Sequence, residues 1–464
     1  MNMIPLKDIS EERIFDLIEK LDVRGPRYTS YPTVPVWKTG DFTDYFIDSL
    51  KRISVEGKPV AVYMHLPYCN SRCFYCGCNS CITRDHNKFR SYIDSLKREI
   101  DIASEYLSDG VRHCQLHLGG GTPTHFPPDM LAGLLDYFIE RVPGSENVDR
   151  SVEVDPRVTT DDHLRLLSQR RFRRISAGLQ DLNADVQKAV NRIFTADKMK
   201  RFVDSARDHG FIGVNIDLIY GLPLQNRKTW AETMKAVLQF DPDRLACFGY
   251  AHLPSKIKHQ RAIRENDLPS SRERLGMLLD ANRFFAENGY EAVGMDHFAK
   301  PDDELARAKN NGRLWRNFMG YTDIAGLELL GLGCSAISEF KNLFVQNQFP
   351  PEQYEDKLAG GHLPIVKGYK LDADDIIRKK FINHLMCNLK IRIPFDENGE
   401  NAQTIGDLKR SLEKIGHFED EGLMVPDAEG FAITPLGQLF LRNIAMPFDR
   451  YLSTESVAAF SKTV

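Results

Sequence analysis

Five of the nine cysteines in this 464-residue chain lie between positions 69 and 81, and Cys69, Cys73 and Cys76 have the spacing Cys-x3-Cys-x2-Cys. Thiolates this close together repel one another unless a cation neutralises them, so such a loop is typical of a metal site. Three thiolates can bind three irons of a [4Fe–4S] cluster and leave the fourth iron open to another ligand. The spacing therefore predicts a cluster that takes part in chemistry rather than a structural metal.

A structural zinc site, formed by the same three cysteines with Cys78 or Cys81, is the alternative. Zinc sites of this kind usually combine two separated ligand pairs, and no second Cys-x2-Cys motif follows. Phe74 and Tyr75 lie between the second and third cysteines of the motif, where they would shield a cluster from water. The iron–sulfur interpretation is favoured.

Polar and glycine-rich residues follow several segments that are rich in β-branched residues. Backbone groups of Gly119–Gly121 can bind the ammonium and carboxylate of an amino acid, although such a run is also a common tight turn. Glu153 can accept hydrogen bonds from ribose hydroxyls, whereas turn chemistry before Pro156 explains Asp155 equally well. Asp217 interrupts an apolar segment and therefore needs a polar partner, which makes it a further candidate for the site.

Other polar residues give weaker signals. Gln180 and Arg192 lie after a predicted strand, but neither is distinctive by itself. His65 lies inside a predicted strand, where a hydrogen-bonded core histidine is more common than a ligand. His252 and His297 are similar candidates for contact with a substrate.

Six predicted β-strands alternate with amphipathic helices, and the candidate residues lie mostly at the carboxyl ends of these strands. The predicted strands are Pro59–Leu66, Val111–Leu118, Ser151–Val154, Arg174–Leu179, Gly213–Tyr220 and Arg244–Tyr250. Repeated strand–helix units predict a parallel sheet, and in barrels the carboxyl rim carries the active site. We expect an α/β fold with an incomplete (β/α)6 barrel. An open dinucleotide-binding sheet is less well supported, because the glycine run lacks the Gly-x-Gly-x-x-Gly spacing.

The barrel is expected over residues 59–340, between two different flanking regions. Residues 1–58 have few aliphatic side chains in their Arg-Tyr-Thr-Ser-Tyr-Pro segment and are predicted to form an arm. Residues 341–464 are predicted to form a small, mainly helical winged-helix-like domain, with helices at 372–388, 405–415 and 435–444 and a hairpin at 423–434. Such domains often bind DNA, but no basic recognition face is evident here.

The composition excludes several classes of protein. A net charge of −4, with 61 basic and 65 acidic residues, argues against a general nucleic-acid binder. No stretch reaches the roughly 18 apolar residues of a membrane span, and the first residues lack the pattern of a secretory signal. The odd number of cysteines indicates a reducing cytoplasm rather than a disulfide framework, and the four outside the loop lie in apolar surroundings.

The cysteine motif after a first strand, with an aromatic residue before its third cysteine, resembles that of the radical S-adenosylmethionine enzymes. The full set of motifs is closer still to the oxygen-independent coproporphyrinogen III oxidase family. The shared segments are Arg27–Thr33, Tyr63–Cys69, Cys78, Gly119–Thr124, Glu153–Arg157, Asn215–Pro223, Gly294–Ala299 and Gly333–Ser338. Tyr75 stands where the family often has phenylalanine, and Leu118 stands where a tryptophan can precede the glycines. Both departures keep the surroundings largely apolar.

The resemblance implies specific ligands. Cys69, Cys73 and Cys76 would bind a [4Fe–4S] cluster and, with Glu153, carry out the catalysis. A first S-adenosylmethionine would chelate the open iron and lie near Tyr63, Gly120, Glu153 and Ile337. A second S-adenosylmethionine would lie near Tyr75, Gly121, Thr122, Gln180, Arg192, Asp217 and Ala251. Arg27, Arg157 and Arg192 are hypothesised to hold substrate propionates or the cofactor carboxylate.

The resemblance also implies a reaction in haem biosynthesis. A 5′-deoxyadenosyl radical would oxidatively decarboxylate two propionates of coproporphyrinogen III to vinyl groups, without dioxygen, to give protoporphyrinogen IX. Electrons would come from a flavodoxin or ferredoxin and leave to an unknown acceptor. A haem-binding chaperone with the same fold is the rival interpretation, but such relatives generally lack both the arm and a cysteine at position 78. One nearly complete set of motifs for one active site suits a monomer.

Overall fold

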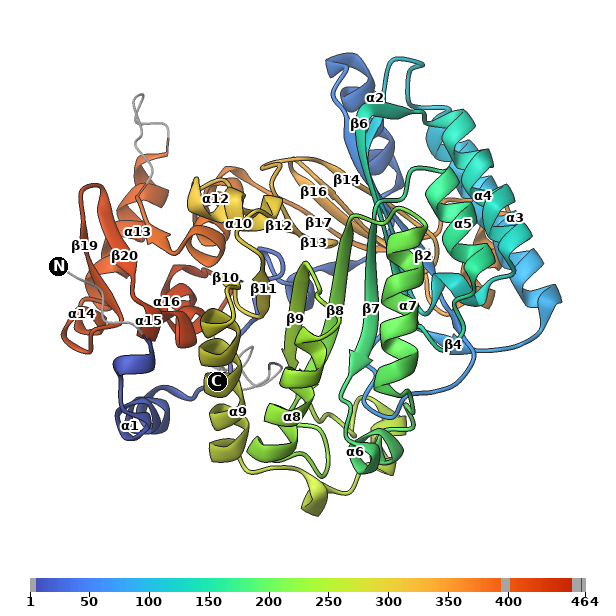
Figure 1. Ribbon diagram of the computed structural model, residues 1–464. Coiled ribbons are helices and arrows are strands. Elements are labelled where there is room, and N and C mark those ends of the chain that lie inside the picture. The colour runs from blue at the N-terminus through green and yellow to red at the C-terminus, as the bar shows by residue number, and fades with distance from the viewer. Residues whose placement is uncertain (1–5, 394–400, 453–459, 461–464) are drawn as a thin grey trace. The chain divides into compact units, whose positions relative to one another are not determined.

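The computed structural model describes residues 6–393, 401–452 and 460, and the chain divides into two compact units (Figure 1). The larger unit comprises residues 38–277 and 327–369. The smaller unit is drawn from residues 1–37, 278–326 and 370–464. The division into an arm, a barrel and a C-terminal domain stays a prediction.

Six parallel strands form the centre of the larger unit and are hydrogen-bonded side by side in chain order. They are β2 (Val60–Leu66), β5 (His113–Gly120), β6 (Gly144–Val154), β7 (Arg174–Gln180), β8 (Gly213–Tyr220) and β9 (Arg244–Gly249). The predicted strand–helix alternation is confirmed, with β6 beginning earlier than expected. The strand order is linear, so the sheet is an open partial barrel. Within β2 every side chain except Tyr63 is buried, as a strand covered on both faces requires.

Helices connect these strands and cover the outer side of the sheet (Figure 1). They are α2 (Thr43–Glu56), α3 (His86–Ser104), α4 (Pro128–Arg141), α5 (Asp161–Gln169), α6 (Ala184–Ala189), α7 (Ala196–Asp208) and α8 (Arg227–Leu238). Asp85, Asn183, Thr195 and Asn226 accept hydrogen bonds from first-turn N–H groups of α3, α6, α7 and α8. These side chains fix where the helices begin, immediately after the loops that carry the candidate residues.

The sheet continues beyond β2 on the side opposite β5. β14 (Leu329–Leu332) pairs in parallel with β2, and the further strands are β15 (Ile337–Phe340), β16 (Leu343–Asn347), β17 (Ile365–Lys370) and β1 (Lys38–Thr39). Helix α11 (Pro351–Ala359) connects β16 to β17. The sequence assigns residues up to 340 to the barrel, and a turn there separates β14 from β15. It does not predict β16 and β17, because they lie in the region that the sequence assigns to a mainly helical domain.

The smaller unit is mainly helical. Its elements are α1 (Glu11–Leu21), β10 (Glu291–Val293), β11 (His297–Ala299), α10 (Glu304–Asn310), β12 (Trp315–Asn317), β13 (Gly320–Thr322), α12 (Ala373–Asn388), β18 (Lys390–Ile391), α13 (Ala402–Lys414), α14 (His417–Asp420), β19 (Met424–Asp427), β20 (Gly430–Ile433), α15 (Pro435–Leu439) and α16 (Leu441–Ala445). Helix α9 (Ser271–Glu287) has residues in both units.

The predicted C-terminal hairpin is confirmed as β19 and β20, and β18 extends it to a three-stranded sheet. The helix expected at 435–444 is instead two short helices, α15 and α16, because Phe440 between them leaves helical geometry with φ −109° and ψ 18°. No helix among the described residues is long and apolar enough to cross a membrane.

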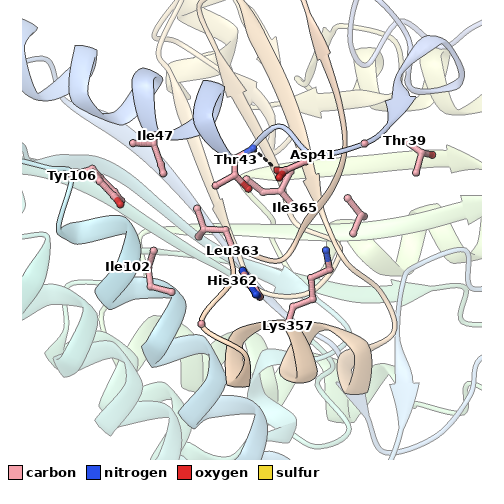
Figure 2. A pocket seen from close by; sticks show the side chains of 13 residues that line it. Thr39, Asp41, Thr43, Ile47, Ile102, Tyr106, Lys357, His362, Leu363 and Ile365 are labelled. Atoms are coloured by element: carbon pink, nitrogen blue, oxygen red, sulfur yellow. Dashed lines mark hydrogen bonds between the residues drawn. The ribbon is translucent and has the colours of Figure 1, made fainter.

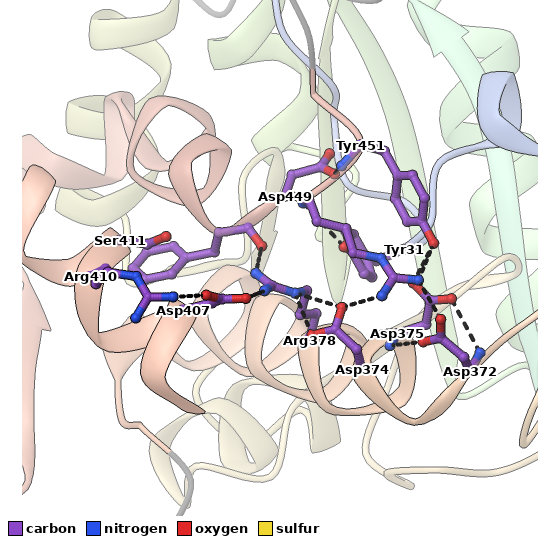
Figure 3. A network of polar contacts seen from close by, with 12 residues as sticks. Tyr31, Asp372, Asp374, Asp375, Arg378, Asp407, Arg410, Ser411, Asp449 and Tyr451 are labelled. Atoms are coloured by element: carbon purple, nitrogen blue, oxygen red, sulfur yellow. Dashed lines mark hydrogen bonds and ion pairs between the residues drawn. The ribbon is translucent and has the colours of Figure 1, made fainter. Parts of the chain in front are cut away.

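A network of charges stabilises α12 in the smaller unit (Figure 3). Nε of Arg378 donates to Asp374 at 2.9 Å, and its Nη1 donates to the carbonyl of Phe448 at 2.9 Å. Arg450 donates to Asp372 at 2.7 Å and to Asp374 at 2.6 Å. The two guanidinium groups therefore neutralise the acidic residues at the start of α12 and tie this helix to the segment at 448–450.

Candidate active site

The cysteine loop leaves the carboxyl end of β2, and backbone hydrogen bonds close it at its base. Two short strands, β3 (Tyr68–Cys69) and β4 (Cys81–Ile82), pair at the two ends of the loop. The N–H of Cys81 also donates to the carbonyl of Pro67 at 2.8 Å. The protein backbone itself therefore fixes the ends of the loop.

Cationic and polar groups contact the loop sulfurs. Nη2 of Arg157 and Nη1 of Arg192 each lie 3.5 Å from Sγ of Cys73. Oγ1 of Thr122 lies 3.3 Å from Sγ of Cys69. Positive charge and hydrogen-bond donors favour the thiolate, which is the form of cysteine that binds metals.

Cys76 is also surrounded by donors. The backbone N–H of Cys78 donates to Sγ of Cys76 at 3.4 Å, and the hydrogen bond from the Cys78 thiol lowers the pKa of Cys76 to about 6. Burial raises the pKa of Cys69 to about 11, so that sulfur needs a cation to become a thiolate near neutral pH.

The spacing of the sulfurs separates the two metal interpretations. A tetrahedral zinc ion with Zn–S bonds of about 2.3 Å would hold its sulfurs about 3.8 Å apart. Among the described residues, which include all nine cysteines, no three cysteine sulfurs lie within 4.8 Å of one another. Cys69, Cys73 and Cys76 therefore fit a larger, polynuclear cluster better than a single zinc ion.

The glycine run packs its backbone directly against the start of the cysteine loop. The N–H of Gly121 donates to the carbonyl of Leu66 at 2.8 Å, and a Cβ at Gly121 would lie 2.5 Å from the carbonyl oxygen of Pro67. Gly120 has φ +112°, which L-residues with a side chain rarely adopt. Glycine is required at both positions, and the run brings β5 and the cysteine loop together.

Glu153 at the end of β6 presents a carboxylate beside the glycines. Its Oε1 lies 3.4 Å from Nε2 of His117, whose ring stacks on that of Tyr63. Burial raises the pKa of Glu153, but His117 and the hydrogen bond from the N–H of Gly120 lower it by more. The pKa of Glu153 is therefore below its usual value. Its side chain remains 48% exposed, so an ionised carboxylate is available to accept hydrogen bonds from a ligand.

His65 has the environment of a buried structural histidine, as the sequence suggests. It lies 2.9 Å from the carbonyl of Asn79 through Nε2 and 3.1 Å from the hydroxyl of Tyr63 through Nδ1. Burial lowers the pKa of His65 to about 4, so the ring is neutral. Its contacts hold Tyr63 and the far side of the cysteine loop in place.

Asp155 positions both arginines that contact Cys73. Its Oδ2 lies 2.6 Å from Nη2 of Arg157 and 3.0 Å from Nη1 of Arg192. Burial raises the pKa of Asp155, but the charge of Arg192 and the bonds from Arg157 outweigh it and lower the pKa overall. Asp155 therefore serves in both ways, because its Oδ1 also accepts the backbone N–H of Arg157 at 3.0 Å, as in a turn, while its carboxylate holds the two arginines beside Cys73.

Gln180 and Arg192 lie side by side at the end of β7. A Cβ at Gly178 would meet Nε2 of Gln180 at 2.8 Å and Nη2 of Arg192 at 2.9 Å. Oε1 of Gln180 is buried and has no hydrogen-bond partner. Buried acceptors are nearly always satisfied in folded proteins, so this oxygen indicates a missing donor.

Asp217 on β8 has the polar partners that its place in an apolar strand requires. Its carboxylate accepts hydrogen bonds from Oγ of Ser176 at 3.2 Å and from Nδ2 of Asn215 at 2.7 Å. Oδ1 of Asn215 is a second buried acceptor without a partner. β7 and β8 together therefore present two unsatisfied oxygens near a carboxylate.

The remaining predicted residues border the same strand ends. Nε2 of Gln260 donates to the carbonyls of both Tyr75 and Ala251 at 3.1 Å, which joins the cysteine loop to the segment after β9. Ile337 begins β15, and its backbone packs against Gly331, the residue that pairs with Tyr63. The structure thus brings the predicted cofactor residues to one edge of the larger unit.

Arg27 is placed differently. It belongs to the smaller unit, where its Nη2 lies 2.9 Å from Oδ2 of Asp296. The same carboxylate contacts Nδ1 of His297 through Oδ1 at 2.6 Å. The structure therefore gives Arg27 an acidic partner within its own unit.

A separate pocket of about 500 Å³ opens between α2, α3 and β17 of the larger unit (Figure 2). Ile47, Ile102 and Leu363 form much of its apolar wall, and Lys357 and His362 contribute polar groups. None of the predicted cluster or cofactor residues lines it, so it is distinct from the candidate site.

Two residues of the site are absent from the sequence-based set. His117 lies on β5 two residues before the glycines, and Asn215 lies on β8 two residues before Asp217. Both are polar residues on the same strand face as a residue that was singled out, since side chains alternate along a strand. That alternation is the signal that would have found them.

Comparison with known proteins gives a consistent match. Residues 63–237 match the model of the Radical SAM superfamily. The oxygen-independent coproporphyrinogen III oxidase of Pseudomonas aeruginosa is 39% identical over 451 residues, which cover 97% of this chain and 98% of the relative. The enzyme of the same name from Escherichia coli is 38% identical over 449 residues, with 97% and 98% covered. The solved structure of coproporphyrinogen III oxidase from Escherichia coli, described as a radical SAM enzyme, superimposes with a TM-score of 0.87 at 37% identity and covers 94% of this chain and 99% of its own.

Proposed function

The chain belongs to the oxygen-independent coproporphyrinogen III oxidase family of radical S-adenosylmethionine enzymes, and we propose that it decarboxylates two propionates of coproporphyrinogen III. Each propionate becomes a vinyl group, and the product is protoporphyrinogen IX, an intermediate on the way to haem. The observation that carries the proposal is the gathering of three spaced cysteines, the glycine run and the Glu153 carboxylate at one edge of the sheet.

The substrate explains why this chemistry needs a cofactor. The β-carbon of a propionate carries no activating group, so an acid or base of the protein cannot remove its hydrogen at neutral pH. When bound, the [4Fe–4S] cluster and S-adenosylmethionine supply a primary carbon radical that is able to do so. The protein supplies binding, orientation and the exclusion of water.

We assign the first cofactor site to the ends of β2, β5 and β6. Cys69, Cys73 and Cys76 would hold the cluster, and Glu153 would accept hydrogen bonds from ribose hydroxyls. The lowered pKa of Glu153 keeps this carboxylate ionised, as an acceptor must be. Gly120 lets the ligand approach the backbone, and Tyr63 and Ile337 flank it.

A second S-adenosylmethionine is proposed beside β7 and β8. The unsatisfied oxygens of Gln180 and Asn215 support this assignment, because an ammonium or hydroxyl group of a ligand would supply the missing donors. Arg192 would bind the ligand carboxylate, and Asp217 would bind its cationic or hydroxyl groups. Tyr75, Gly121, Thr122 and Ala251 complete the proposed lining.

The proposal includes the substrate, the electron donor, the oligomeric state and the cellular compartment. The substrate is a porphyrinogen, the electron donor is a flavodoxin or ferredoxin, and the chain acts as a monomer in a reducing cytoplasm. All nine cysteines are free thiols, which agrees with such a compartment.

Anaerobically reconstituted protein tests the function. With S-adenosylmethionine, dithionite and coproporphyrinogen III, it is expected to form protoporphyrinogen IX together with methionine and 5′-deoxyadenosine. Bound iron without decarboxylation would instead indicate a haem chaperone, and bound zinc without iron would contradict the cluster. Cys78→Ser is expected to bind a full complement of iron, since three thiolates suffice.

A further inference from the structure

We propose that an exposed basic pocket at α7, beside the cysteine loop, is the docking surface for an acidic electron-carrier protein. The inference deepens the proposed function and rests on it, because each cleavage of S-adenosylmethionine needs one electron from outside. We call this surface the α7 patch. It is a pocket of about 340 Å³ lined by Pro156, Arg157, Ile193, Phe194, Lys198 and Arg201.

The α7 patch is positively charged on a protein that is acidic overall. Half of its lining residues are cations and none is acidic, whereas the whole chain has a net charge of −4. Such a local excess attracts an oppositely charged partner and orients it during encounter.

Its outer cations are not neutralised by the protein. Lys198 and Arg201 lie one turn apart on α7, and both are exposed. Within the described part of the chain, neither makes a salt bridge, whereas Lys200 on the same helix pairs with Asp204. Asp197 precedes Lys198 but does not line the pocket. The two charges are therefore free to meet carboxylates of a partner.

An apolar residue accompanies these charges. Ile193 is 61% exposed, and the half-buried ring of Phe194 follows it. An apolar centre with a charged rim is typical of protein interfaces, and the brief encounters of electron-transfer proteins need only a small one. A small inorganic anion would gain nothing from Ile193, so the patch fits a protein better.

The α7 patch is joined directly to the predicted cluster ligands. Arg157 lines it and also lies 3.5 Å from Sγ of Cys73 through Nη2. Its Nη1 donates to the carbonyl of Asn191 at 3.4 Å, and Nδ2 of Asn191 donates to the carbonyl of Arg72 in the cysteine loop at 2.8 Å. Cys73 is only 8% exposed, so an electron must reach the cluster through protein. Because electron transfer slows steeply with distance, a donor seated here has a short route.

The occupant is a small protein with an acidic face around a low-potential one-electron centre. One electron leaves the carrier, which is oxidised by one electron, and the cluster is reduced by one electron. No bond forms or breaks in this step. Carboxylates of the carrier would meet Lys198 and Arg201, and an apolar residue would cover Ile193.

The test uses the reconstituted holoenzyme with two reductants, reduced flavodoxin and dithionite. The variant K198E/R201E reverses both outer charges, and K228E/K235E makes the same change of charge on exposed positions of α8 as a matched control. We expect the Kd for flavodoxin, and the KM for flavodoxin in S-adenosylmethionine cleavage, to rise about tenfold or more in K198E/R201E. Dithionite-driven cleavage is expected to stay within about twofold of wild type, since dithionite needs no docking surface.

Two further measurements separate charge from apolar contact. Raising the salt concentration should weaken flavodoxin binding to wild type and leave binding to K198E/R201E nearly unchanged, because salt screens exposed charges. Ile193→Ser should weaken binding at every salt concentration.

Several results would overturn the inference. These are unchanged flavodoxin binding in K198E/R201E, an equal loss in the α8 control, or an equal loss with dithionite. Binding of inorganic phosphate at the patch without any binding of flavodoxin would also overturn it and indicate a small-anion site. Wild-type protein that binds flavodoxin and cleaves S-adenosylmethionine but forms no protoporphyrinogen IX would contradict the proposed function alone.

Discussion

Two regions of the molecule gather charged and polar side chains, but they differ in whether the protein itself supplies every polar partner. At α12 in the smaller unit, Asp372, Asp374 and Asp375 all pair with Arg378 or Arg450. Their oxygens lie within 4.8 Å of one another, yet the arginines already occupy the place that a cation would take. This network is complete as it stands.

The parallel strands and the cysteine loop of the larger unit are different. Oxygens of Gln180 on β7 and Asn215 on β8 are buried without partners, and no three of the loop sulfurs lie within 4.8 Å of one another. The clustered carboxylates at α12 are therefore part of a structural salt-bridge network. The unsatisfied acceptors and the separated thiols of the larger unit instead indicate a ligand-binding site. Substitutions in the two regions should accordingly fail in different ways.

The largest effect is expected from Cys73→Ser. Loss of one of the three proposed cluster ligands should remove bound iron and reduce S-adenosylmethionine cleavage about a thousandfold or more, because the radical then has no source. Iron analysis and the formation of 5′-deoxyadenosine measure the two quantities. Cys81→Ser is the matched control from the same loop and should keep its iron. Equal iron loss in both variants would instead favour a site with four cysteine ligands.

Asp155→Ala should come next, because it leaves Arg192 and Arg157 without their shared carboxylate. An uncompensated buried charge destabilises a protein by about 3 kcal/mol or more, and the support for Cys73 is lost with it. Urea denaturation of the apo protein measures the loss, and Asp129→Ala on the exposed face of α4 is the control. Unchanged stability would show that the two arginines find other partners.

Arg378→Ala sharpens the comparison from the other side. Arg378 is only 5% exposed, so its loss should destabilise the fold by about 3 kcal/mol by leaving Asp374 and the carbonyl of Phe448 unpaired. Iron content and S-adenosylmethionine cleavage per folded molecule should not change. A loss of iron or of cleavage per folded molecule in Arg378→Ala would remove the distinction between the two regions.

Glu99→Gln tests a buried carboxyl that has partners but no neutralising charge. The Glu99 carboxyl accepts hydrogen bonds from the Tyr354 hydroxyl, Nδ2 of Asn347 and the N–H of Gly333. Burial nevertheless raises the pKa of Glu99 to about 7. Between about pH 4.5 and 7 the native state binds more protons than the unfolded state, so stability should fall as pH rises through this window. The slope should approach about 1.4 kcal/mol per pH unit. Urea midpoints across the window should show a flatter profile for Glu99→Gln, and an identical profile would contradict the prediction.

The smallest effect is expected from Gln180→Leu. It removes one unsatisfied acceptor, so the fold should be unaffected, but the affinity for the proposed second S-adenosylmethionine should fall about tenfold. Equilibrium binding measures both the affinity and the number of ligands per chain. Gln239→Leu, at an exposed position after α8, is the control. Two ligands bound with unchanged affinity would place the second site elsewhere.

Much of the fold follows from local sequence patterns. The six parallel strands and the connecting helices are predictable, because each is an apolar segment of the correct period bounded by turn residues. The cysteine loop is predictable because its ligands are adjacent in sequence. Strands β16 and β17 are missed although helix α11 connects them, because both lie beyond residue 340, in the region that the sequence assigns to a mainly helical domain.

The sequence predicts individual residues of the candidate site but not the contacts between their side chains. Glu153 stands out as a charge near a strand end, and Asp217 stands out as a charge inside an apolar strand. The tie of Asp155 to Arg192 joins residues 37 positions apart and depends on the register of β6 and β7, which the sequence does not specify. For the same reason His117 and Asn215 emerge only when neighbouring strands are side by side.

The pairing of β3 with β4 makes the fold of the cysteine loop independent of a bound metal. In small zinc domains the metal holds the chain together, so losing it unfolds them. In this protein, backbone hydrogen bonds between β3 and β4 hold the two ends of the cysteine loop together. β2 and the glycine run connect the loop to the sheet. We therefore expect a molecule that has lost its iron to oxygen to keep its fold, so that added iron and sulfide can restore the cluster without refolding.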